Sequence, residues 1–509
     1  MKKVVIILIC LSLLICPAVL SSCGDKADQN SSGGDKNNAQ TNDNAGQNDN
    51  ADDSTPEEEV RIFPDIPEDL NFGGYKFRAF YSSVDEAGVW GLRDIVPLEE
   101  DEGEVINDAV IARNIYLEEK YNFEIAGIPT TSSSMTTASM RKVIQSGSDD
   151  YDVLFVRQNQ TGGLITNGCL VDLNTVPYLD LDKPWWDKSI IDQLSVGRKS
   201  FAASGDIIST NSNALRVFLF NKQMVADLGL EMPYALVREN KWTLDAFYNM
   251  CKDVSKDVNG DGVMDEKDQY GYLAQSGVTI NMFYAAGLRA VEKNGEGIPS
   301  LVAGNEKMYQ VLSKINEILS TKDAVMLDQY YVGLDTRGQE YVLMGTFEAG
   351  RGLFFSEVLQ LAERMRGTDT VFGILPPPKA DENQAEYMSF ADSWCMNLML
   401  VPTTNDNLER TGQILEAMCA ESKYGLRPAY YEKTLKGKYS RDDDSEEMLD
   451  IIIKNKVVSL DEMFEWGMHS AIQDTLYKRT GDFTSMFDKN LDKSRKKLEK
   501  TIDTIENLD

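Results

Sequence analysis

The sequence predicts an α/β protein with two lobes, and three observations support this. The chain has 509 residues, 42% of them hydrophobic, which is more than one hydrophobic core usually serves. Between residues 75 and 156 the predicted elements alternate as strand, helix, strand, helix, strand, an order that implies parallel pairing with right-handed crossovers. The run VLFV at 153–156 is continuously apolar, as in a strand that is covered on both faces.

The N-terminal segment reads as an export signal. Lys2 and Lys3 precede the apolar run VVIILICLSLLIC, which is long enough for a signal-peptide core and too short to span a bilayer comfortably. The segment ends in LSSC and resembles the lipobox of bacterial lipoproteins, which implies that residues 1–22 are removed and that Cys23 is lipidated. An ordinary cleaved signal with a chance cysteine is the alternative. Two acyl chains would hold the protein stably on a membrane, so we expect a lipid-anchored protein on the extracellular face of the cell membrane.

Residues 23–70 are predicted to contain the lipidated cysteine and a disordered tether. From Gly24 to about Glu59 the sequence is polar and nearly free of apolar residues, so it cannot bury a core. About 5 to 6 Å times the square root of its length gives a typical reach of roughly 30 to 35 Å.

Ordered structure is predicted to begin with a strand in NFGGYKFRAFYSS. A helix is expected from about Glu104 to Lys120, a strand in YNFEIAGI, a helix near Met135 to Gln145 and a strand in YDVLFV. Further on, LRVFLFN is a predicted strand, and WTLDAFYNMCKDVSK is a predicted helix with Thr243 placed to cap its start. Later helices are expected at 305–320, 355–365, 406–421, 446–455 and about 483–508.

Composition excludes several functions. The net charge of −31 repels phosphate groups, so a nucleic-acid partner is not expected. A single histidine, His469, rules out zinc sites with two or three imidazoles and triads with a helper histidine, and we expect it to pack within a helix. We favour buried thiols over disulfides for the four cysteines beyond the anchor, which are Cys169, Cys251, Cys395 and Cys419.

The segment DVNGDGVMDEKD at 257–268 has the spacing of a calcium-binding loop, with Gly262 at its sharp turn. The expected ligands are Asp257, Asn259, Asp261, the carbonyl of Val263, Asp265 directly or through water, and Asp268. Aspartate at the last position is one methylene shorter than the usual glutamate, so affinity would be modest. A helix precedes the loop but a strand, QYGYLAQS, follows it, so we expect a structural Ca²⁺ clip, because a sensor moves two helices.

Five motifs occur in a fixed order along the chain: FNKQMVADLGLEMPY, KWTLDAF, TFEAGRGLFF, FGILPPPK and ADSWCMNLMLVPTT. In this order they resemble the bacterial extracellular solute-binding proteins of family 1, the maltose type, which serve ABC transporters. The resemblance runs from about Asn71 to the C terminus. It implies a periplasmic-binding-protein-like fold with two lobes, a cleft, and several crossovers between the lobes, near 213–217, 389–394 and 424–431. Lobe 1 would comprise 71–213 plus 388–425, and lobe 2 would comprise 214–387 plus 426–509.

Ligands of such sheets sit beyond the carboxyl ends of the strands, and sugars need flat aromatic faces together with polar side chains. Candidates at strand tips and crossovers are Tyr81, Gln158, Asn159, Asn211, Asn213, Asp392 and Trp394. Trp185 and Trp186 are expected to pack structurally, whereas Phe354 and Phe355 fit the cleft and the core equally well.

The resemblance implies a receptor that passes a sugar, perhaps an oligosaccharide, to ABC permease subunits. The net charge disfavours anionic solutes, although Arg157 or Arg351 could reverse this locally. A receptor for peptides or amino acids is one alternative. A secreted glycoside-acting enzyme is another, because acidic residues are abundant enough for a pair of carboxylates, and an adhesive lipoprotein is a third. We expect no enzyme, because the sequence has no G-x-S-x-G elbow, phosphate loop or Cys/His couple.

Overall fold

The computed structural model of this protein describes residues 61–82, 91–98, 103–130, 136–321, 323–330, 334, 338, 340–439 and 442–508. All of them belong to one compact unit, Arg61–Asp509. The predicted signal peptide, Cys23 and most of the predicted tether lie outside the described residues.

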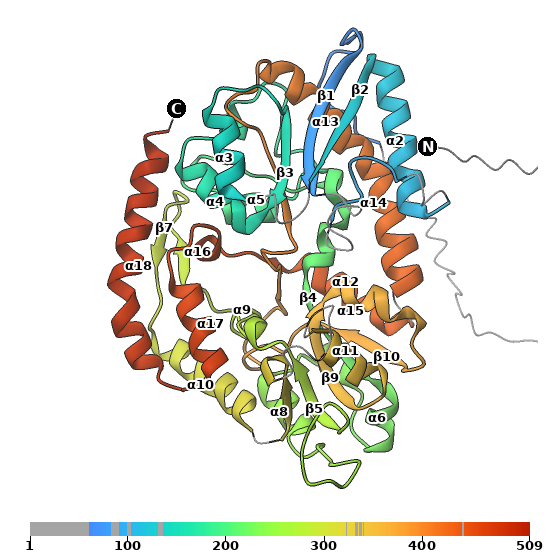
Figure 1. Cartoon of the computed structure of the whole chain (residues 1–509), viewed down its shortest axis with the longest axis vertical. Coiled ribbons are helices and arrows are strands. Elements are labelled where there is room, and N and C mark those ends of the chain that lie inside the picture. The colour runs from blue at the N-terminus through green and yellow to red at the C-terminus, as the bar shows by residue number, and fades with distance from the viewer. Residues whose placement is uncertain are drawn as a thin grey trace, which may run out of the picture. The chain divides into compact units, whose positions relative to one another are not determined.

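The first sheet has four strands in the order β12-β3-β1-β2 and forms the core of lobe 1 (Figure 1). Strand β1 pairs in parallel with both β2 and β3, as the alternation of strands and helices predicted, and β12 is antiparallel to β3. The strands are β1 (Tyr75–Ser82), β2 (Phe123–Thr130), β3 (Val153–Arg157) and β12 (Asn397–Leu400). The helices around them are α2 (Val105–Tyr121), α3 (Thr137–Gln145), α4 (Gln158–Thr166), α5 (Lys188–Leu194) and α13 (Leu408–Tyr424).

The second sheet has five strands in the order β10-β4-β9-β5-β8 and forms the core of lobe 2. Its strands are β4 (Arg216–Asn221), β5 (Tyr270–Ala274), β8 (Val325–Leu327), β9 (Gly352–Val358) and β10 (Phe372–Leu375). Its helices are α6 (Lys222–Asp227), α7 (Pro233–Arg238), α8 (Leu244–Cys251), α9 (Asn281–Ala285), α10 (Glu306–Ser320), α11 (Glu340–Glu348) and α12 (Leu359–Arg364). A separate hairpin joins β6 (Val291–Lys293) and β7 (Pro299–Leu301).

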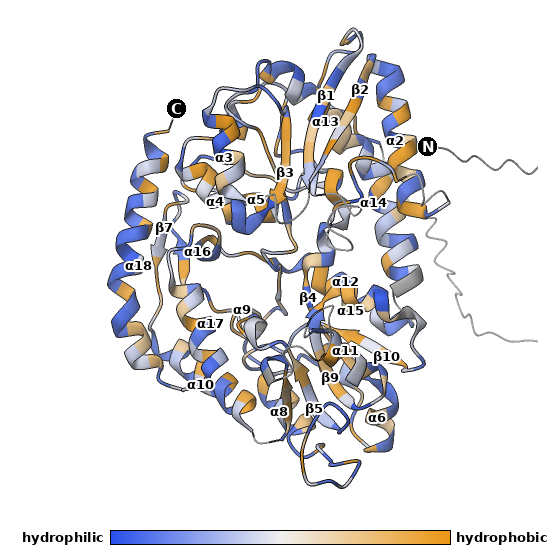
Figure 2. Ribbon diagram, viewed as in Figure 1, coloured by the Kyte–Doolittle hydropathy of each residue, from blue (hydrophilic) through white to orange (hydrophobic). Residues whose placement is uncertain are grey.

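The strands form where apolar and β-branched or aromatic residues run without interruption. Every residue of β4 and β9 is buried, and strands β3 and β10 stand out as hydrophobic in Figure 2. Phe354 and Phe355 are fully buried in β9, and Phe354 packs against Trp242 and Phe247. These two phenylalanines therefore belong to the core.

Two crossovers between the lobes run side by side. The segment η4 (Asp206–Ala214) leads into β4, and β11 (Ser389–Phe390) leads back towards β12. Leu215 and Ala391 form an isolated antiparallel bridge, and the Asp392 amide donates to the Ala214 carbonyl at 2.9 Å. The third passage runs from α13 through α14 (Leu426–Pro428) and the π-helical segment η8 (Ala429–Tyr439).

The C-terminal segment, predicted to belong to lobe 2, contacts elements of both predicted lobes. It contains α15 (Asp443–Lys454), β13 (Lys456–Val457), α16 (Leu460–Met463), α17 (Met468–Lys478) and α18 (Phe483–Glu506). Helix α15 packs on β10 in lobe 2, whereas α16 packs on α4 in lobe 1, and α18 packs on both β7 and α4 (Figure 1). Buried side chains recur along all of α18, including Phe487, Leu498 and Ile505, so the helix has an apolar face for each lobe.

Most predicted elements agree with the structure to within a few residues. Thr243 caps α8 by accepting from the Ala246 amide, and His469 is buried in α17. The helix expected at 355–365 is an error: β9 extends to Val358, and α12 begins only at Leu359. The run LFFSEV pairs with strands on both sides, and this pairing outweighs its helical pattern. Each strand of the two sheets lies within the range predicted for its lobe, while the lobe boundaries themselves stay a prediction.

Candidate functional site

A cleft of about 780 Å³ lies between the two sheets and takes residues from both lobes. Arg157 ends β3 in lobe 1, and Asn159 stands in the first turn of α4. From lobe 2, Gln275 follows β5, Asn281 begins α9, and Glu357 lies near the end of β9. The cleft thus lies beyond the carboxyl ends of strands from both sheets, where α/β folds bind ligands.

The crossover at 391–395 and the C-terminal segment complete the cleft. Asp392, Ser393 and Trp394 line it from the crossover, and Glu462 and His469 line it from α16 and α17. Trp394 has 63% of its surface exposed. Its indole therefore offers a flat apolar face of the kind on which a sugar ring can stack.

A buried arginine joins both walls of the cleft. The Arg216 guanidinium, 4% exposed, forms ion pairs with the carboxylates of Glu357 and Asp392. Burial raises the pKa of the Glu357 carboxyl, and Arg216 opposes this shift. Because a buried charge without a partner is strongly destabilising, this triad fixes the position of each of its members.

Glu462 and His469 form a second polar group in the cleft. The Ser393 hydroxyl donates to Glu462 Oε1 at 2.6 Å, and His469 Nε2 lies 3.5 Å from the same oxygen. Burial, followed by the nearby negative charge of Asp392, raises the pKa of Glu462 to about 8. Burial lowers the pKa of His469 to about 4, and its Nδ1 lies 2.8 Å from the Tyr284 hydroxyl. At neutral pH Glu462 is therefore largely protonated and His469 is uncharged.

Five residues that line the cleft keep one buried polar atom without a hydrogen-bond partner among the described residues. Three of these atoms are acceptor oxygens, one is a donor nitrogen, and the fifth is an oxygen of the largely protonated Glu462 carboxyl, which can donate. They are Asn159 Oδ1, Asn281 Oδ1, Glu357 Oε2, Glu462 Oε2 and Arg157 Nε. Buried polar groups in folded proteins are normally paired, so these atoms mark places where a ligand or water would bond.

Three of the residues predicted to bind ligand, Asn159, Asp392 and Trp394, line this cleft. The other four lie elsewhere. Gln158 is fully buried and donates from Nε2 to the Ser459 carbonyl at 3.1 Å, because the first residue of α4 turns towards α16. Asn211 donates to the Asn397 carbonyl at 2.8 Å.

Asn213 accepts a hydrogen bond from the Tyr430 hydroxyl at 3.0 Å. Tyr81 is only 5% exposed and packs beside Gly127 on β2. Neither residue is among those that line the cleft, because each is engaged in packing within lobe 1 or at a crossover.

Sequence reasoning missed Arg216, Asn281, Glu357 and Glu462. A charged residue inside an otherwise apolar strand was the available signal for two of them, Arg216 in LRVFLFN and Glu357 in LFFSEV. Nothing local distinguishes Glu462, which reaches the cleft only because α16 packs on α4. Arg157 lines the cleft, whereas Arg351 donates to the Glu266 carbonyl within the predicted calcium loop.

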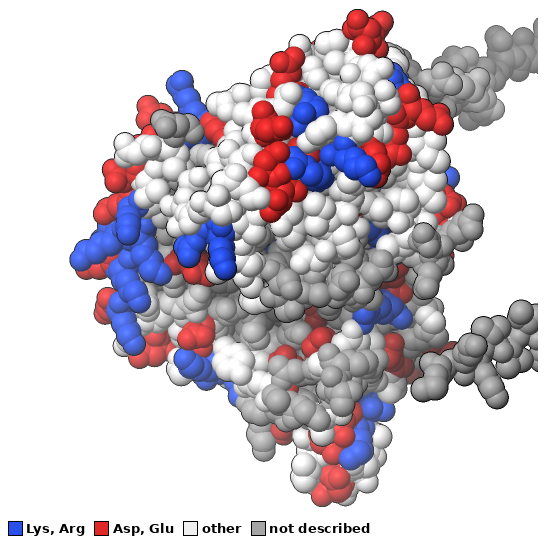
Figure 3. Space-filling view, turned by 45° about the horizontal axis from the view of Figure 1, so that its top comes forward, with Lys and Arg blue, Asp and Glu red and all other residues white. Residues whose placement is uncertain are grey.

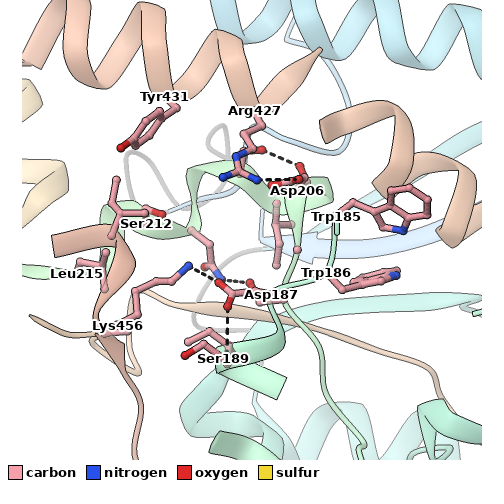
Figure 4. Close-up of a pocket in the computed structure, with 18 of the residues that line it drawn as sticks. Trp185, Trp186, Asp187, Ser189, Asp206, Ser212, Leu215, Arg427, Tyr431 and Lys456 are labelled. Atoms are coloured by element: carbon pink, nitrogen blue, oxygen red, sulfur yellow. Dashed lines mark hydrogen bonds and ion pairs between the residues drawn. The ribbon is translucent and has the colours of Figure 1, made fainter. Parts of the chain in front are cut away.

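A second pocket of about 460 Å³ is lined by residues near the crossovers and by Trp185 and Trp186 (Figure 4). Its charged groups are largely paired: Lys456 with Asp187, and Arg427 with Asp206 at 3.5 Å. Burial raises the pKa of Asp206 to about 6. A ligand would have to displace existing partners here, so the larger cleft is the better candidate.

The tryptophan pair is structural, as predicted. Trp185 and Trp186 are 1% and 4% exposed, and their indole N–H groups donate to Glu416 at 3.1 and 3.0 Å. Burial raises the pKa of Glu416 to about 7.

The four cysteines beyond the predicted anchor are free thiols, as favoured from the sequence. Cys169, Cys251 and Cys419 are buried, and Cys395 is half-buried.

The predicted calcium loop follows α8 and precedes β5, and a pair of backbone hydrogen bonds between Lys256 and Gln269 closes it. Asp257 accepts from the amides of Gly260 and Gly262 at 2.6 and 2.8 Å. These two glycines have φ values of 72° and 82°, which a glycine adopts without strain.

The buried Asp268 accepts from the amides of Val258 and Asp265, which draws both ends of the loop together. In the part of the chain that the structure describes, the acid oxygens that converge within 4.8 Å belong to Asp149, Asp152 and Asp406. The carboxylates of the loop are not in that group. Arg78 and Arg410 neutralise the converging group instead.

Acidic and basic side chains are interspersed over the face of the molecule in Figure 3. Among the described residues, none of the helices combines the length and the apolar character that a membrane span requires.

Several solved structures share this fold, and some of them are described as sugar complexes or as ABC substrate-binding proteins. A cyclo/maltodextrin-binding protein complexed with maltotetraose is 13% identical over 84% of this chain and 98% of its own, with a TM-score of 0.55. UspC of M. tuberculosis is 12% identical over 83% of this chain and 100% of its own, with a TM-score of 0.52.

An ABC substrate-binding protein from Listeria monocytogenes, in complex with cycloalternan, is 11% identical over 85% of this chain and 97% of its own, with a TM-score of 0.51. No family model and no curated protein matches the sequence. At these identities the likeness establishes the fold, which is the two-lobed α/β fold expected from the sequence.

Proposed function

We propose that this chain, which has the two-lobed fold of the binding proteins above, is an extracellular receptor that delivers a carbohydrate to an ABC-type importer. The observation that carries the proposal is the cleft between the lobes, which joins an exposed indole face to buried polar atoms that lack partners. Maltotetraose and cycloalternan, which are named with two of the similar structures, are consistent with an oligosaccharide. A volume of about 780 Å³ falls in the range of small-molecule sites.

The receptor binds its solute without turning it over. The test is a thermal-shift screen of the mature chain against saccharides, amino acids and peptides, followed by calorimetry and chromatography of the recovered ligand. A saturable, intact sugar ligand supports the proposal. A stabilising peptide or amino acid with no response to sugars would overturn it, and release of shorter saccharides would point to a glycoside-acting enzyme.

Trp394 should contribute most of the apolar contact with the sugar. Trp394→Ala removes the exposed face, and we expect a loss of affinity of about fivefold or more, because stacking on an aromatic ring is worth about 1 kcal/mol or more. Val371→Ala is the matched control, because Val371 is also an exposed apolar side chain but is not among the residues that line the cleft. Unchanged affinity of the Trp394 variant would remove the indole from the site.

We also propose that Cys23 carries a lipid that holds the receptor on the outer face of the cell membrane. The support is the sequence LSSC after a charged and apolar leader. Metabolic labelling with a palmitate analogue should label the wild-type chain. The labelled chain should be found in the membrane fraction. A Cys23→Ala variant that stays membrane-bound would contradict the anchor.

A structural Ca²⁺ ion in the loop at 257–268 is a third proposal. Its support is the oxygen spacing, the tight turn at Gly262 and the ends drawn together by Asp268. No residue of the loop is among the described residues that line the cleft, and the ion would clip α8 to β5 within lobe 2. Calcium should raise the melting temperature, a chelator should lower it, and sugar affinity should not change.

Asp257→Asn should weaken this calcium response, and Asp253→Asn, outside the loop, is its matched control. A chelator that abolished sugar binding without lowering the melting temperature would contradict the clip.

A further inference from the structure

The cleft contains more negative than positive side chains. Its described lining has five carboxylic acids against two guanidinium groups. The acids are Glu340, Glu357, Asp392, Glu462 and Glu465, and the guanidinium groups belong to Arg157 and Arg216. Glu462 is largely protonated because burial raises its pKa to about 8, and His469 is held neutral by burial, which lowers its pKa to about 4.

Arg216 does not offset this excess for a ligand. Its guanidinium is buried between Glu357 and Asp392 and bonds both. Arg157 is then the remaining cation, and burial lowers its pKa. The raised pKa of Glu462 has the same origin, since burial and the charge of Asp392 both favour a proton on this carboxyl. Among the described lining residues, few positive charges are therefore available to a ligand.

The unpaired hydrogen-bonding atoms of the described cleft lining also favour a cation, because acceptors outnumber donors among them. Among the described cleft residues, the atoms without partners include three acceptor oxygens, on Asn159, Asn281 and Glu357, and one donor nitrogen, on Arg157; the protonated carboxyl of Glu462 adds a second donor. Two of the acceptors belong to side chains that are almost completely buried, Glu357 at 2% and Asn281 at 3% exposure. A neutral hydroxyl brings one donor and two acceptor sites, whereas an ammonium group brings three donors and no acceptor. The second kind of group fits this set of unpaired atoms better.

We propose that the solute is a cationic amino sugar, a saccharide that bears a free ammonium group. The ammonium would bond the acceptors contributed by Glu357 and Asn281, and a ring face would stack on Trp394. The same carboxylates would repel a uronic acid or a sugar phosphate. This inference rests on the proposed function, because it names the class of sugar that the receptor takes.

The experiment compares glucosamine oligosaccharides with their N-acetylated counterparts of equal length by calorimetry at pH 6.5, where the free amine is charged. N-acetylation removes the charge and leaves the ring hydroxyls in place. We expect the free amine to bind more than tenfold tighter, and a galacturonate oligosaccharide to bind more weakly than either. Addition of salt should narrow the difference between amine and acetamide.

Two variants of the full chain test which carboxylate the ammonium group of the ligand bonds. Glu357→Gln should lower affinity for the amine at least tenfold while changing affinity for the acetamide less. Glu499→Gln on the exposed side of α18 removes an equal charge outside the cleft and should change neither. Circular dichroism and melting temperature establish that both variants fold.

The outcomes separate this inference from the function on which it rests. If the acetylated or another uncharged sugar binds as tightly as the amine, the inference fails and the receptor function stands. If no saccharide of any charge binds, the proposed function itself fails. An amine preference that survives Glu357→Gln without any loss would overturn the assigned contact.

Discussion

Glu416 accepts hydrogen bonds from two adjacent indoles and is itself buried, so its removal leaves two donors without a partner. We expect Glu416→Ala to lower the free energy of unfolding by about 2 to 4 kcal/mol, since each unsatisfied buried donor costs about 1 to 3 kcal/mol. Urea denaturation followed by tryptophan fluorescence measures the effect. Glu119→Ala on the exposed side of α2 is the control and should change stability by less than about 0.5 kcal/mol. Equal effects of the two substitutions would show that Glu416 does not hold the tryptophan pair.

Glu462 makes the stability of the fold depend on pH. Its pKa rises from 4.5 to about 8 on folding, so the native state binds the extra proton between these values and stability falls as pH rises towards 8. Between pH 7 and 8 we expect a loss of up to about 1.4 kcal/mol. The interval from pH 7 to 8 begins at the pKa of Glu416, about 7, and lies well above the pKa of His469, about 4. In Glu462→Gln the slope between pH 7 and 8, measured by urea denaturation, should be smaller; an unchanged slope contradicts the assignment.

At the scale of elements, the contact between α4 and α16 depends on a glycine. A Cβ atom on Gly162 would lie 2.1 Å from the Met463 carbonyl oxygen. We expect Gly162→Ala to destabilise the protein by about 1 to 3 kcal/mol, because one of the two helices must shift. Gly345→Ala in α11 is the control: a Cβ there meets nothing within 4 Å, and alanine favours a helix over glycine by about 1 kcal/mol. A neutral Gly162 variant would mean that α4 and α16 can separate without cost.

Elements could be predicted from the sequence where periodicity and local signals agree. The helix over Glu306–Ser320 and the capped start of α8 are examples, because apolar spacing and a capping residue are visible within one turn. The end of β9 could not be predicted, since LFFSEV is fixed by strands β4 and β5, which lie far from it in the sequence.

The residues of the candidate site could likewise be predicted only where a local signal marks them. Asn159 could be predicted as a strand-tip residue, whereas Gln158 beside it faces α16. The orientation of one residue relative to its neighbour depends on tertiary contacts, and the sequence does not specify them. Glu462 belongs to a segment whose contact with lobe 1 has no local signal.

At the scale of the whole molecule, the C-terminal segment couples the two lobes. Helix α18 contacts β7 and α4, and Trp466 donates to Thr501 at 2.9 Å, which ties α18 to the segment beside the cleft. We expect one cooperative thermal transition, with calorimetric and van't Hoff enthalpies that agree. A chain that ends at Gly481 should unfold in two steps in scanning calorimetry. Two transitions in the full-length chain would contradict the coupling.

Gln158 and Ser459, which bond each other between α4 and α16, are 301 residues apart in the chain. A contact of this separation forms only after most of the polypeptide has been made, and folding is slow when such distant contacts dominate. Lobe 1 therefore stays incomplete until the last helices emerge from the ribosome. In the proposed extracellular receptor this delay would be useful, because a chain that has not yet closed its contacts can still be threaded through a secretion channel.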